Sequence, residues 1–190
     1  MERRVSTEGD RLVLIPDTSA RSSGLNREVE MKGNPKVIEA LNGALHEELT
    51  AINQYFLHAE MCENWHYRKL SAYIKKQSID EMRHAESLIE RILFLDGIPN
   101  MTELMQLSVG ANVKAQLESD MKLELAAVKM YNDAVALCRD EGDNASRELF
   151  ERLLKNEEEH VDWLEAQLHQ IKELGYERYL GQQIGEQEEK

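Results

Sequence analysis

The sequence contains little proline, little cysteine and no long apolar run. Only three prolines occur in 190 residues, at positions 16, 35 and 99, so long stretches on either side of Pro99 carry no residue that forbids a helix. Leu, Ala, Glu, Lys, Met and Gln fill those stretches, and all six are good helix formers. The composition therefore favours an all-α protein, and 42% apolar residues are enough for the core of one domain.

The other scarcities exclude whole classes of protein. Two cysteines, Cys62 and Cys138, are too few for a disulfide framework, and both fall within helical patterns as small buried thiols do. No apolar run approaches the roughly 20 residues of a membrane span, and the N-terminus lacks the apolar core of a secretion signal. The net charge of -13 repels nucleic acid and anionic membranes. We therefore expect a cytoplasmic protein that binds neither.

The chain divides into three parts by composition. The first thirty residues are rich in Arg and Ser, and their short apolar run ends at Pro16. We expect residues 1–30 to form a flexible extension, residues 31–185 to form one domain and residues 186–190 to form a polar tail. Acidic residues within the extension argue against an organelle-targeting peptide. Met31 offers an alternative translation start, so the role of the extension stays open.

Apolar residues at three- and four-residue steps predict four long helices and one short one. Asn34 and Pro35 form a helix start signal, with Asn as N-cap and Pro in the first turn. The expected helices run from Pro35 to a turn near residues 64 and 65, from about 67 to 96, from about 112 to 140, from the break at 142–144 to about 174, and from 177 to 180. The connection 97–111 is long enough, at up to ~50 Å, to travel the ~45 Å length of a thirty-residue helix. The pattern predicts a four-helix bundle with a long crossover between helices 2 and 3.

Two copies of one pattern, a lone Glu followed by Glu-x-x-His, lie 76 residues apart. The residues of the pattern are Glu48, Glu81 and His84 in the first copy, and Glu124, Glu157 and His160 in the second. In each expected hairpin the two Glu residues are equally far from the turn, so they lie at the same height. Residues three apart on a helix are ~60° apart around it, so Glu and His of each Glu-x-x-His reach the same interior point. Four carboxylates and two imidazoles should therefore meet inside the bundle.

This set of side chains predicts a site for two metal ions. Four ionised carboxylates in an apolar core repel one another and are costly to desolvate, whereas two divalent cations would balance their charge. Hard oxygen ligands with a little nitrogen suit iron or manganese better than copper or a structural zinc. The segment Glu63-Asn64-Trp65-His66 has the same local motif, but it lies at the expected turn and has no counterpart 76 residues later. We interpret that motif as surface chemistry without function.

Two tyrosines extend the repeat. Tyr55 and Tyr131 are 76 residues apart, and each follows a Glu of the pattern by seven residues. The simpler interpretation is that they are core tyrosines with satisfied hydroxyls. The alternative is that they hydrogen-bond the ligand carboxylates or supply an electron during oxygen reduction.

Five segments of the sequence closely resemble the bacterioferritin family. They are residues 31–33, 51–58, 78–86, 90–95 and 160–165, and the likeness extends from Met31 to about Gly185. The resemblance implies a ferritin-like four-helix bundle with a short fifth helix and a cage of 24 subunits built from dimers. It also implies iron storage, with oxidation of Fe(II) by oxygen or hydrogen peroxide, storage of the ferric mineral inside the cage, and haem b shared between two subunits. A haem-reducing ferredoxin is the partner implied by the family.

The resemblance also assigns roles to residues. The six residues of the repeat would be the ferroxidase ligands of a di-iron centre, with Glu81 and Glu157 bridging the two irons. Met82 would be the haem axial ligand, and it lies ~100° around the helix from Glu81, away from the interior. Lys76 stands where some members carry a histidine that, together with the residue at Asp80, holds an additional iron. A lysine ammonium is a poor iron ligand, so only Asp80 remains to attract cations there.

Two alternatives stay open at this point. One is a di-iron oxygenase or a rubrerythrin-type peroxidase, but no Cys-x-x-Cys pair exists for a rubredoxin module and no substrate-binding insertion is evident. The other is a haem-carrying cage subunit whose iron chemistry belongs to a partner subunit, which the complete set of six ligands argues against. The sequence leaves open the oxidant used in the cell, the haem occupancy and whether the cage has one kind of subunit.

Overall fold

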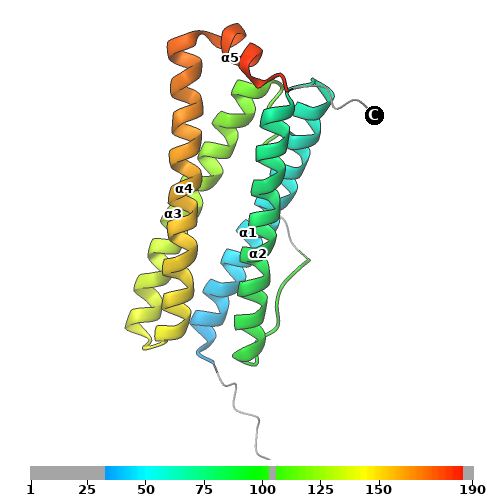
Figure 1. The fold of residues 1–190 in the computed structure, drawn as a ribbon. Helices are drawn as coiled ribbons and strands as arrows, with labels where there is room; N and C mark the ends of the chain where they lie inside the picture. Colours follow the sequence, from blue (N-terminus) through cyan, green and yellow to red (C-terminus); the bar gives the residue numbers. More distant parts are fainter. Residues whose placement is uncertain (1–32, 103–105, 186–190) are drawn as a thin grey trace, which may run out of the picture. The chain divides into compact units, whose positions relative to one another are not determined.

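The computed structural model describes residues 33–102 and 106–185, and all regular structure in this part of the chain is helical. The helices are α1 (Pro35–Asn64), α2 (Arg68–Phe94), α3 (Val113–Asp140), α4 (Asn144–Leu174) and α5 (Tyr176–Gln183). Helices α1 and α2 form one antiparallel hairpin, α3 and α4 form the other, and α5 follows the end of α4 (Figure 1). The predicted all-α bundle is confirmed, and the fifth helix is longer than the sequence suggested. The expected extension 1–30 and tail 186–190 lie outside the described residues.

Side-chain caps fix where three of the helices begin. Asn34 accepts a hydrogen bond from the Lys36 backbone N–H at 2.9 Å, as the Asn-Pro signal predicted. Asn112 caps α3 by accepting from the backbone N–H of Ala115 at 3.0 Å. Asp143 caps α4 by accepting from the backbone N–H of Ser146 at 3.0 Å. Each cap satisfies an N–H group that the first turn of a helix leaves without a partner.

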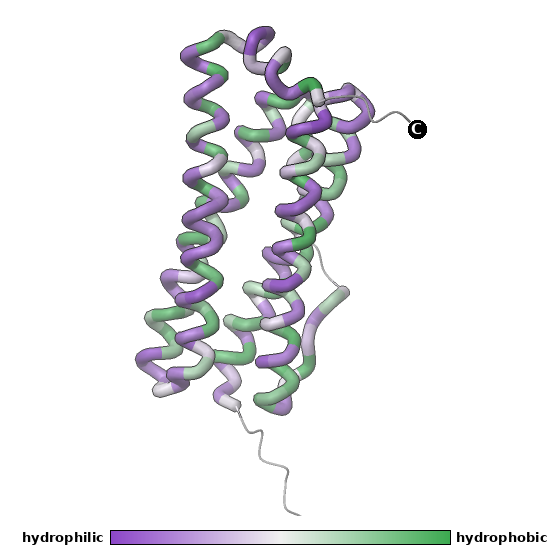
Figure 2. The backbone as a smooth tube through the Cα atoms, in the orientation of Figure 1, coloured by the Kyte–Doolittle hydropathy of each residue, from purple (hydrophilic) through white to green (hydrophobic). Residues whose placement is uncertain are grey.

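The helices are amphipathic, and apolar and polar segments alternate along each of them (Figure 2). Their buried apolar residues form two clusters. One cluster packs around Leu41, Leu88, Ile92 and Phe150, and the other around Leu70, Ile74, Leu117 and Leu164. Both cysteines are buried, as expected. Several apolar residues at the margins of the apolar stripes are only half-buried: Ile52, Met121, Val128, Val135, Leu154 and Leu168.

The crossover between α2 and α3 follows α1 along much of its length. Near the start of α1, the Asn42 side chain donates to the Ile98 carbonyl at 3.2 Å and accepts from the Asn100 backbone N–H at 2.7 Å. Twelve residues further along α1, Gln54 accepts from the Ser108 backbone N–H at 2.9 Å. The connection therefore carries the chain back to the end of the bundle where α2 began, so that α3 runs antiparallel to α1.

Each of the two hairpin turns contains a residue with a positive φ. His66, in the turn between α1 and α2, has a φ of 64°, and Gly142, in the turn between α3 and α4, has a φ of 75°. These residues are 76 positions apart, so they occupy equivalent places in the repeat. Glu63 and His66 are both exposed, which agrees with the interpretation that their motif belongs to a turn. Among the described residues, no helix is both long enough and apolar enough to cross a membrane.

Candidate metal centre

The fold brings all six residues of the repeat together in the middle of the bundle. Each of the four long helices contributes to the cluster, and every member is at least nine-tenths buried. The contributors are Glu48 from α1, Glu81 and His84 from α2, Glu124 from α3, and Glu157 and His160 from α4. The matched distances from the turns thus translate into matched heights in three dimensions.

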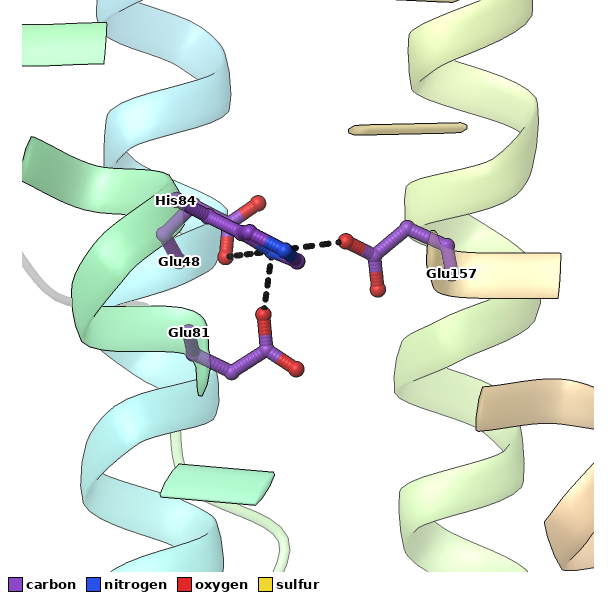
Figure 3. A group of neighbouring side chains, drawn as sticks. All are labelled: Glu48, Glu81, His84 and Glu157. Atoms are coloured by element: carbon purple, nitrogen blue, oxygen red, sulfur yellow. Dashed lines mark ion pairs between the residues drawn. The ribbon is translucent and has the colours of Figure 1, made fainter. Parts of the chain in front are cut away.

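His84 lies at the centre of one half of the cluster (Figure 3). Its Nδ1 atom is 2.7 Å from Glu81 Oε2, 3.1 Å from Glu157 Oε1 and 3.5 Å from Glu48 Oε2. These three carboxylates come from three different helices, and their oxygens converge on one side of the imidazole.

His160 lies at the centre of the other half. Its Nδ1 atom is 3.0 Å from Glu81 Oε1, 3.4 Å from Glu157 Oε2 and 3.7 Å from Glu124 Oε2. The ring planes of the two histidines are nearly parallel, at 19°, and their centroids are 6.2 Å apart. The second half therefore repeats the first with Glu124 in place of Glu48.

Glu81 and Glu157 belong to both halves of the cluster. Ligand atoms of Glu48, Glu81, His84 and Glu157 lie within 4.8 Å of one another, and the same holds for Glu81, Glu124, Glu157 and His160. Each half offers three carboxylates and one imidazole, a donor set that suits iron or manganese. Two adjacent ions that share two carboxylates would fit this arrangement.

Several carboxylate oxygens and imidazole nitrogens of the cluster have no hydrogen-bond partner within the described part of the chain. These atoms are Glu81 Oε1 and Oε2, Glu157 Oε1, and Nδ1 of both His84 and His160. Buried polar groups are almost always satisfied, because an unsatisfied one costs about 1–3 kcal/mol. The short contacts between these atoms lack hydrogen-bond geometry, whereas metal ions placed between them would satisfy every one. The residues therefore fit a pair of metal ions.

The four carboxylates form two pairs that differ in protonation. Glu81 and Glu157 are the shared pair, and Glu48 and Glu124 are the outer pair. Burial is the main cause that raises the pKa of Glu48 and of Glu124 well above the usual value. Burial also opposes the ionisation of Glu157, but the neighbouring imidazoles outweigh it and lower the pKa of Glu157 to about 2. Burial and the charge of Glu157 oppose the ionisation of Glu81, and the same imidazoles still lower its pKa. Without metal, the shared carboxylates carry the negative charge.

The pKa values of both imidazoles are raised, opposite to those of the shared carboxylates. Burial disfavours their charged form, but the surrounding carboxylates outweigh it and raise the pKa of His84 to about 12. Glu124, Glu157 and Glu81 likewise raise the pKa of His160 against the effect of burial. Protonated imidazoles therefore supply the positive charge that metal ions would otherwise bring.

Both predicted tyrosines contact the cluster, and each reaches across to the other hairpin. The Tyr131 hydroxyl on α3 donates to Glu48 Oε1 on α1, and the Tyr55 hydroxyl on α1 donates to Glu124 Oε1 on α3. Both side chains are buried, and burial, together with the neighbouring carboxylates, raises the pKa of each phenol well above its usual value. The hydroxyls are therefore neutral donors that are satisfied by the outer carboxylates.

Met82 and Asp80 do not join the cluster. The Met82 side chain is 55% exposed on α2, so it lies on the outside of the bundle as the helical rotation predicted. Asp80 forms ion pairs with Arg83 at 2.5 Å and with Lys76 at 3.8 Å. The carboxylate that was expected to attract cations is thus already held between two basic side chains.

A buried polar network near the cluster was missed by the sequence analysis. Asp120 on α3 accepts from Gln54 Nε2 at 2.8 Å and lies 3.1 Å from His58 Nδ1, both on α1. The other ends of these side chains hold the crossover, through Ser108 for Gln54 and through the Gly110 backbone N–H, 3.4 Å from His58 Nε2. Gln54 and His58 are four residues apart on the buried side of α1, which was the available signal. Their role is structural, because they fix the crossover to α1 and α3.

A four-helix bundle with four carboxylates and two imidazoles facing one another at its centre defines the class of ferritin-like carboxylate proteins. The family described as Ferritin-like domain matches residues 38–174. The chain is 43% identical over 152 residues to a bacterioferritin of Mycolicibacterium paratuberculosis, covering 80% of this chain and 96% of the relative. It is 46% identical over 149 residues to a bacterioferritin of Brucella melitensis, covering 78% and 92% of the two chains. The chain belongs to the bacterioferritin family.

Proposed function

We propose that this chain is a ferroxidase that oxidises Fe(II) at the buried cluster and stores the product as ferric mineral. Membership of the family and the carboxylate and histidine cluster support iron storage as its function. The observation that carries the ferroxidase activity is the pair of donor groups that share Glu81 and Glu157. Such sharing would hold two Fe(II) ions side by side, so that each could give one electron to the same oxidant.

The residues would act on iron as substrate. Glu48 and His84 would hold one Fe(II), Glu124 and His160 would hold the other, and Glu81 and Glu157 would bridge them. Oxidation of two Fe(II) to two Fe(III) supplies two electrons, which reduce oxygen with two protons to hydrogen peroxide, or hydrogen peroxide with two protons to two waters. The carboxylates stabilise the added positive charge of the ferric product, because hard oxygen donors bind the higher charge more strongly.

The outer face of the first hairpin supports the proposed haem and dimer. Among the exposed large apolar side chains of α1 and α2 are Phe56, Leu57, Ile79 and Met82. A second copy of the chain packed on this face would remove them from water. Met82 is 55% exposed, so its thioether would be available as a haem ligand, and Met82 of a second subunit would supply the other ligand. Assembly of such dimers into a cage of 24 subunits, a cytoplasmic location and a haem-reducing ferredoxin are further parts of the proposal that rest on family resemblance.

The ferroxidase proposal is tested by removing the shared carboxylates. The double variant Glu81→Ala with Glu157→Ala should lower aerobic Fe(II) oxidation, followed by ferric absorbance, to the rate of uncatalysed oxidation. Glu63→Ala is the matched control, because Glu63 belongs to the same local motif but lies exposed in a turn. Rapid oxidation by the double variant would show that the cluster is not the reaction site.

Assembly and haem binding need separate measurements. Electron microscopy should show a hollow shell for the native protein, and a dimer without a shell would favour the oxygenase or peroxidase alternative instead. Iron uptake by an assembly of this chain alone tests whether a partner subunit is required. The visible spectrum after haem reconstitution should show bis-methionine ligation that Met82→Leu abolishes.

A further inference from the structure

A pocket of about 400 Å³ opens between α2 and α4, next to the metal centre. His84 and His160 line it, so the pocket reaches the histidine side of the cluster. On the opposite side, between α1 and α3, a cavity of only about 10 Å³ touches all four carboxylates of the cluster. Of these two spaces beside the centre, the pocket between α2 and α4 is therefore by far the larger.

The charges around this pocket differ from those of the whole chain. Three basic side chains, Lys76, Arg83 and Arg152, line it together with two acidic ones, Asp80 and Glu159. The local balance is positive, whereas the chain as a whole carries a net charge of -13. An excess of positive charge in one hollow of an acidic protein concentrates anions there.

The basic groups are also available to a ligand. Arg83 and Lys76 share the single carboxylate of Asp80, and they remain 68% and 69% exposed. Exposed ion pairs of this kind are weak, so an incoming anion can compete for both cations. In the described part of the chain, Arg152 forms no ion pair with any carboxylate. Two guanidinium groups and one ammonium therefore line the pocket, and they have N–H donors that can bind a ligand.

We propose that this pocket binds inorganic phosphate. Arginine guanidinium groups match phosphate geometry through paired hydrogen bonds, and lysine adds a point charge. The two acidic side chains select among anions, because monohydrogen phosphate carries an O–H that can donate to Asp80 or Glu159. Sulfate at neutral pH has no such donor, so the same carboxylates repel it. Asn156, which also lines the pocket, adds a neutral amide.

The pocket lies beside the cluster, so a phosphate bound in it would meet the ferric product. This inference rests on the proposed ferroxidase function. Fe(III) leaving the centre past His84 and His160 would meet an oxyanion that binds ferric ions through hard oxygen atoms. Phosphate held here would enter the growing mineral with the iron. The lysine at position 76, which makes a poor ligand for an additional iron, is then part of an anion site.

The test titrates inorganic phosphate into the metal-free full-length protein by calorimetry, with sulfate titrated in parallel. We expect saturable phosphate binding, and sulfate binding weaker by about tenfold or more, a difference typical of one lost charged hydrogen bond. Arg83→Gln with Arg152→Gln should weaken phosphate binding by about tenfold or more for the same reason. Arg139→Gln with Arg178→Gln removes the same charge from positions that do not line the pocket, so it should change affinity by less than about twofold.

Three results would overturn the phosphate site: no saturable binding by the native protein, equal binding of sulfate, or equal weakening by the two double variants. Electron microscopy of both variants checks assembly, and Arg152→Lys, which keeps the charge but loses the paired geometry, gives an independent measurement at intermediate affinity. The ferroxidase function is measured separately, as aerobic Fe(II) oxidation in phosphate-free buffer. Native protein that binds phosphate but does not oxidise Fe(II) would remove the proposed function and leave the site. Native protein that oxidises Fe(II) but does not bind phosphate would remove the phosphate site and leave the proposed function.

Discussion

Tyr131 donates its phenolic hydrogen to Oε1 of Glu48, and this contact leaves Oε2 of the same carboxylate facing His84 at 3.5 Å. Tyr55 and Glu124 repeat the arrangement in the other half of the cluster, with Oε2 of Glu124 at 3.7 Å from His160. In each half, a tyrosine from one hairpin holds a carboxylate of the other in one orientation. The tyrosines therefore orient the outer carboxylates and connect the two hairpins.

Tyr131→Phe should lower the affinity of the centre for Co(II), a spectroscopically visible substitute for Fe(II), by about tenfold. The substitution removes only the hydroxyl, so Glu48 loses the contact that orients it, and loss of such an orienting partner costs 10- to 100-fold in metal affinity. Tyr179→Phe is the matched control, because its buried hydroxyl donates to Gln167 at 3.0 Å, away from the cluster. Equal Co(II) affinity in native protein and Tyr131→Phe would show that the tyrosine does not orient the carboxylate.

Metal binding should release protons. His84 and His160 both have raised pKa values in the metal-free protein, so they are charged at neutral pH and must lose a proton to become ligands. We expect about two protons per subunit from the imidazoles, with more from Glu48 and Glu124. The release is measured with Zn(II) in weakly buffered solution under anaerobic conditions. His84→Gln should release fewer protons, His66→Gln should release as many as the native protein, and the absence of any release would contradict the assigned protonation.

Asp143→Asn should destabilise the protein at neutral pH but not in acid. Burial opposes the ionisation of Asp143, but hydrogen bonds from Ser146 and the charge of Arg91 outweigh it and hold the pKa of Asp143 below its usual value. A carboxyl with a lowered folded-state pKa contributes stability above its unfolded pKa, about 3.9, and loses it as the pH falls through the folded pKa. Asn still caps α4, so the expected loss of about 1 kcal/mol reflects the charge alone.

The measurement for Asp143 is the free energy of unfolding of both proteins from pH 7 down to pH 3. The difference between them should be constant near neutral pH and should shrink as the pH falls below about 4. Asp133→Asn serves as a control, because Asp133 pairs with Lys129 in an exposed position on α3. A difference for Asp143→Asn that does not depend on pH would mean that its charge contributes nothing.

Gly110→Ala should destabilise the crossover by about 1–3 kcal/mol, the usual cost of overpacking. A methyl group at this position would lie 2.2 Å from the backbone nitrogen of Gln116 and 2.5 Å from the carbonyl carbon of Ala115, and backbone atoms cannot easily move aside. Gly43→Ala provides the contrast, because Gly43 lies inside α1 with no atom within 4 Å of an added methyl group. That change should stabilise the protein by about 0.5–1 kcal/mol. Thermal unfolding measures both, and equal shifts would contradict the packing argument.

His66→Gly should stabilise the first hairpin by about 0.5–1 kcal/mol, because His66 holds a positive φ that a residue with a Cβ adopts at a cost. The equivalent Gly142 shows that glycine suits this place in the repeat. Gly142→His should be destabilising by a similar amount. Chemical denaturation of the two variants checks the opposite signs, and the same sign in both would refute the explanation from backbone conformation.

Most of the fold could be predicted because it follows from local properties. Helix boundaries follow from signals such as Asn34-Pro35 and from scarce proline, and the apolar period indicates which side of each helix is buried. The least accurate predictions concern α5 and the half-buried residues at the margins of the stripes, such as Ile52 and Met121. The burial of those residues depends on how closely a neighbouring helix approaches, which no single helix contains in its sequence.

The cluster could be predicted because a hairpin converts equal distances from a turn into equal heights. The hydrogen-bond partners of the two tyrosines could not be predicted in this way. Tyr55 follows Glu48 by seven residues, yet it contacts Glu124, because seven residues along one helix span about 10.5 Å while a packed neighbour is only 8–10 Å away. The same limit hid the buried polar network, because Asp120 is 66 residues from Gln54 and 62 residues from His58 in the sequence.

The sequence by itself determined the helices, the kinds of donor at the centre and the 76-residue repeat that placed them. Periodicity, capping and turn chemistry act over a few residues, so these features needed no knowledge of the rest of the chain. Only the tertiary structure decided which tyrosine holds which carboxylate, and that Lys76, Arg83 and Arg152 line one pocket beside the histidines. Those features depend on distances between helices, which are set when the apolar faces of all four pack together.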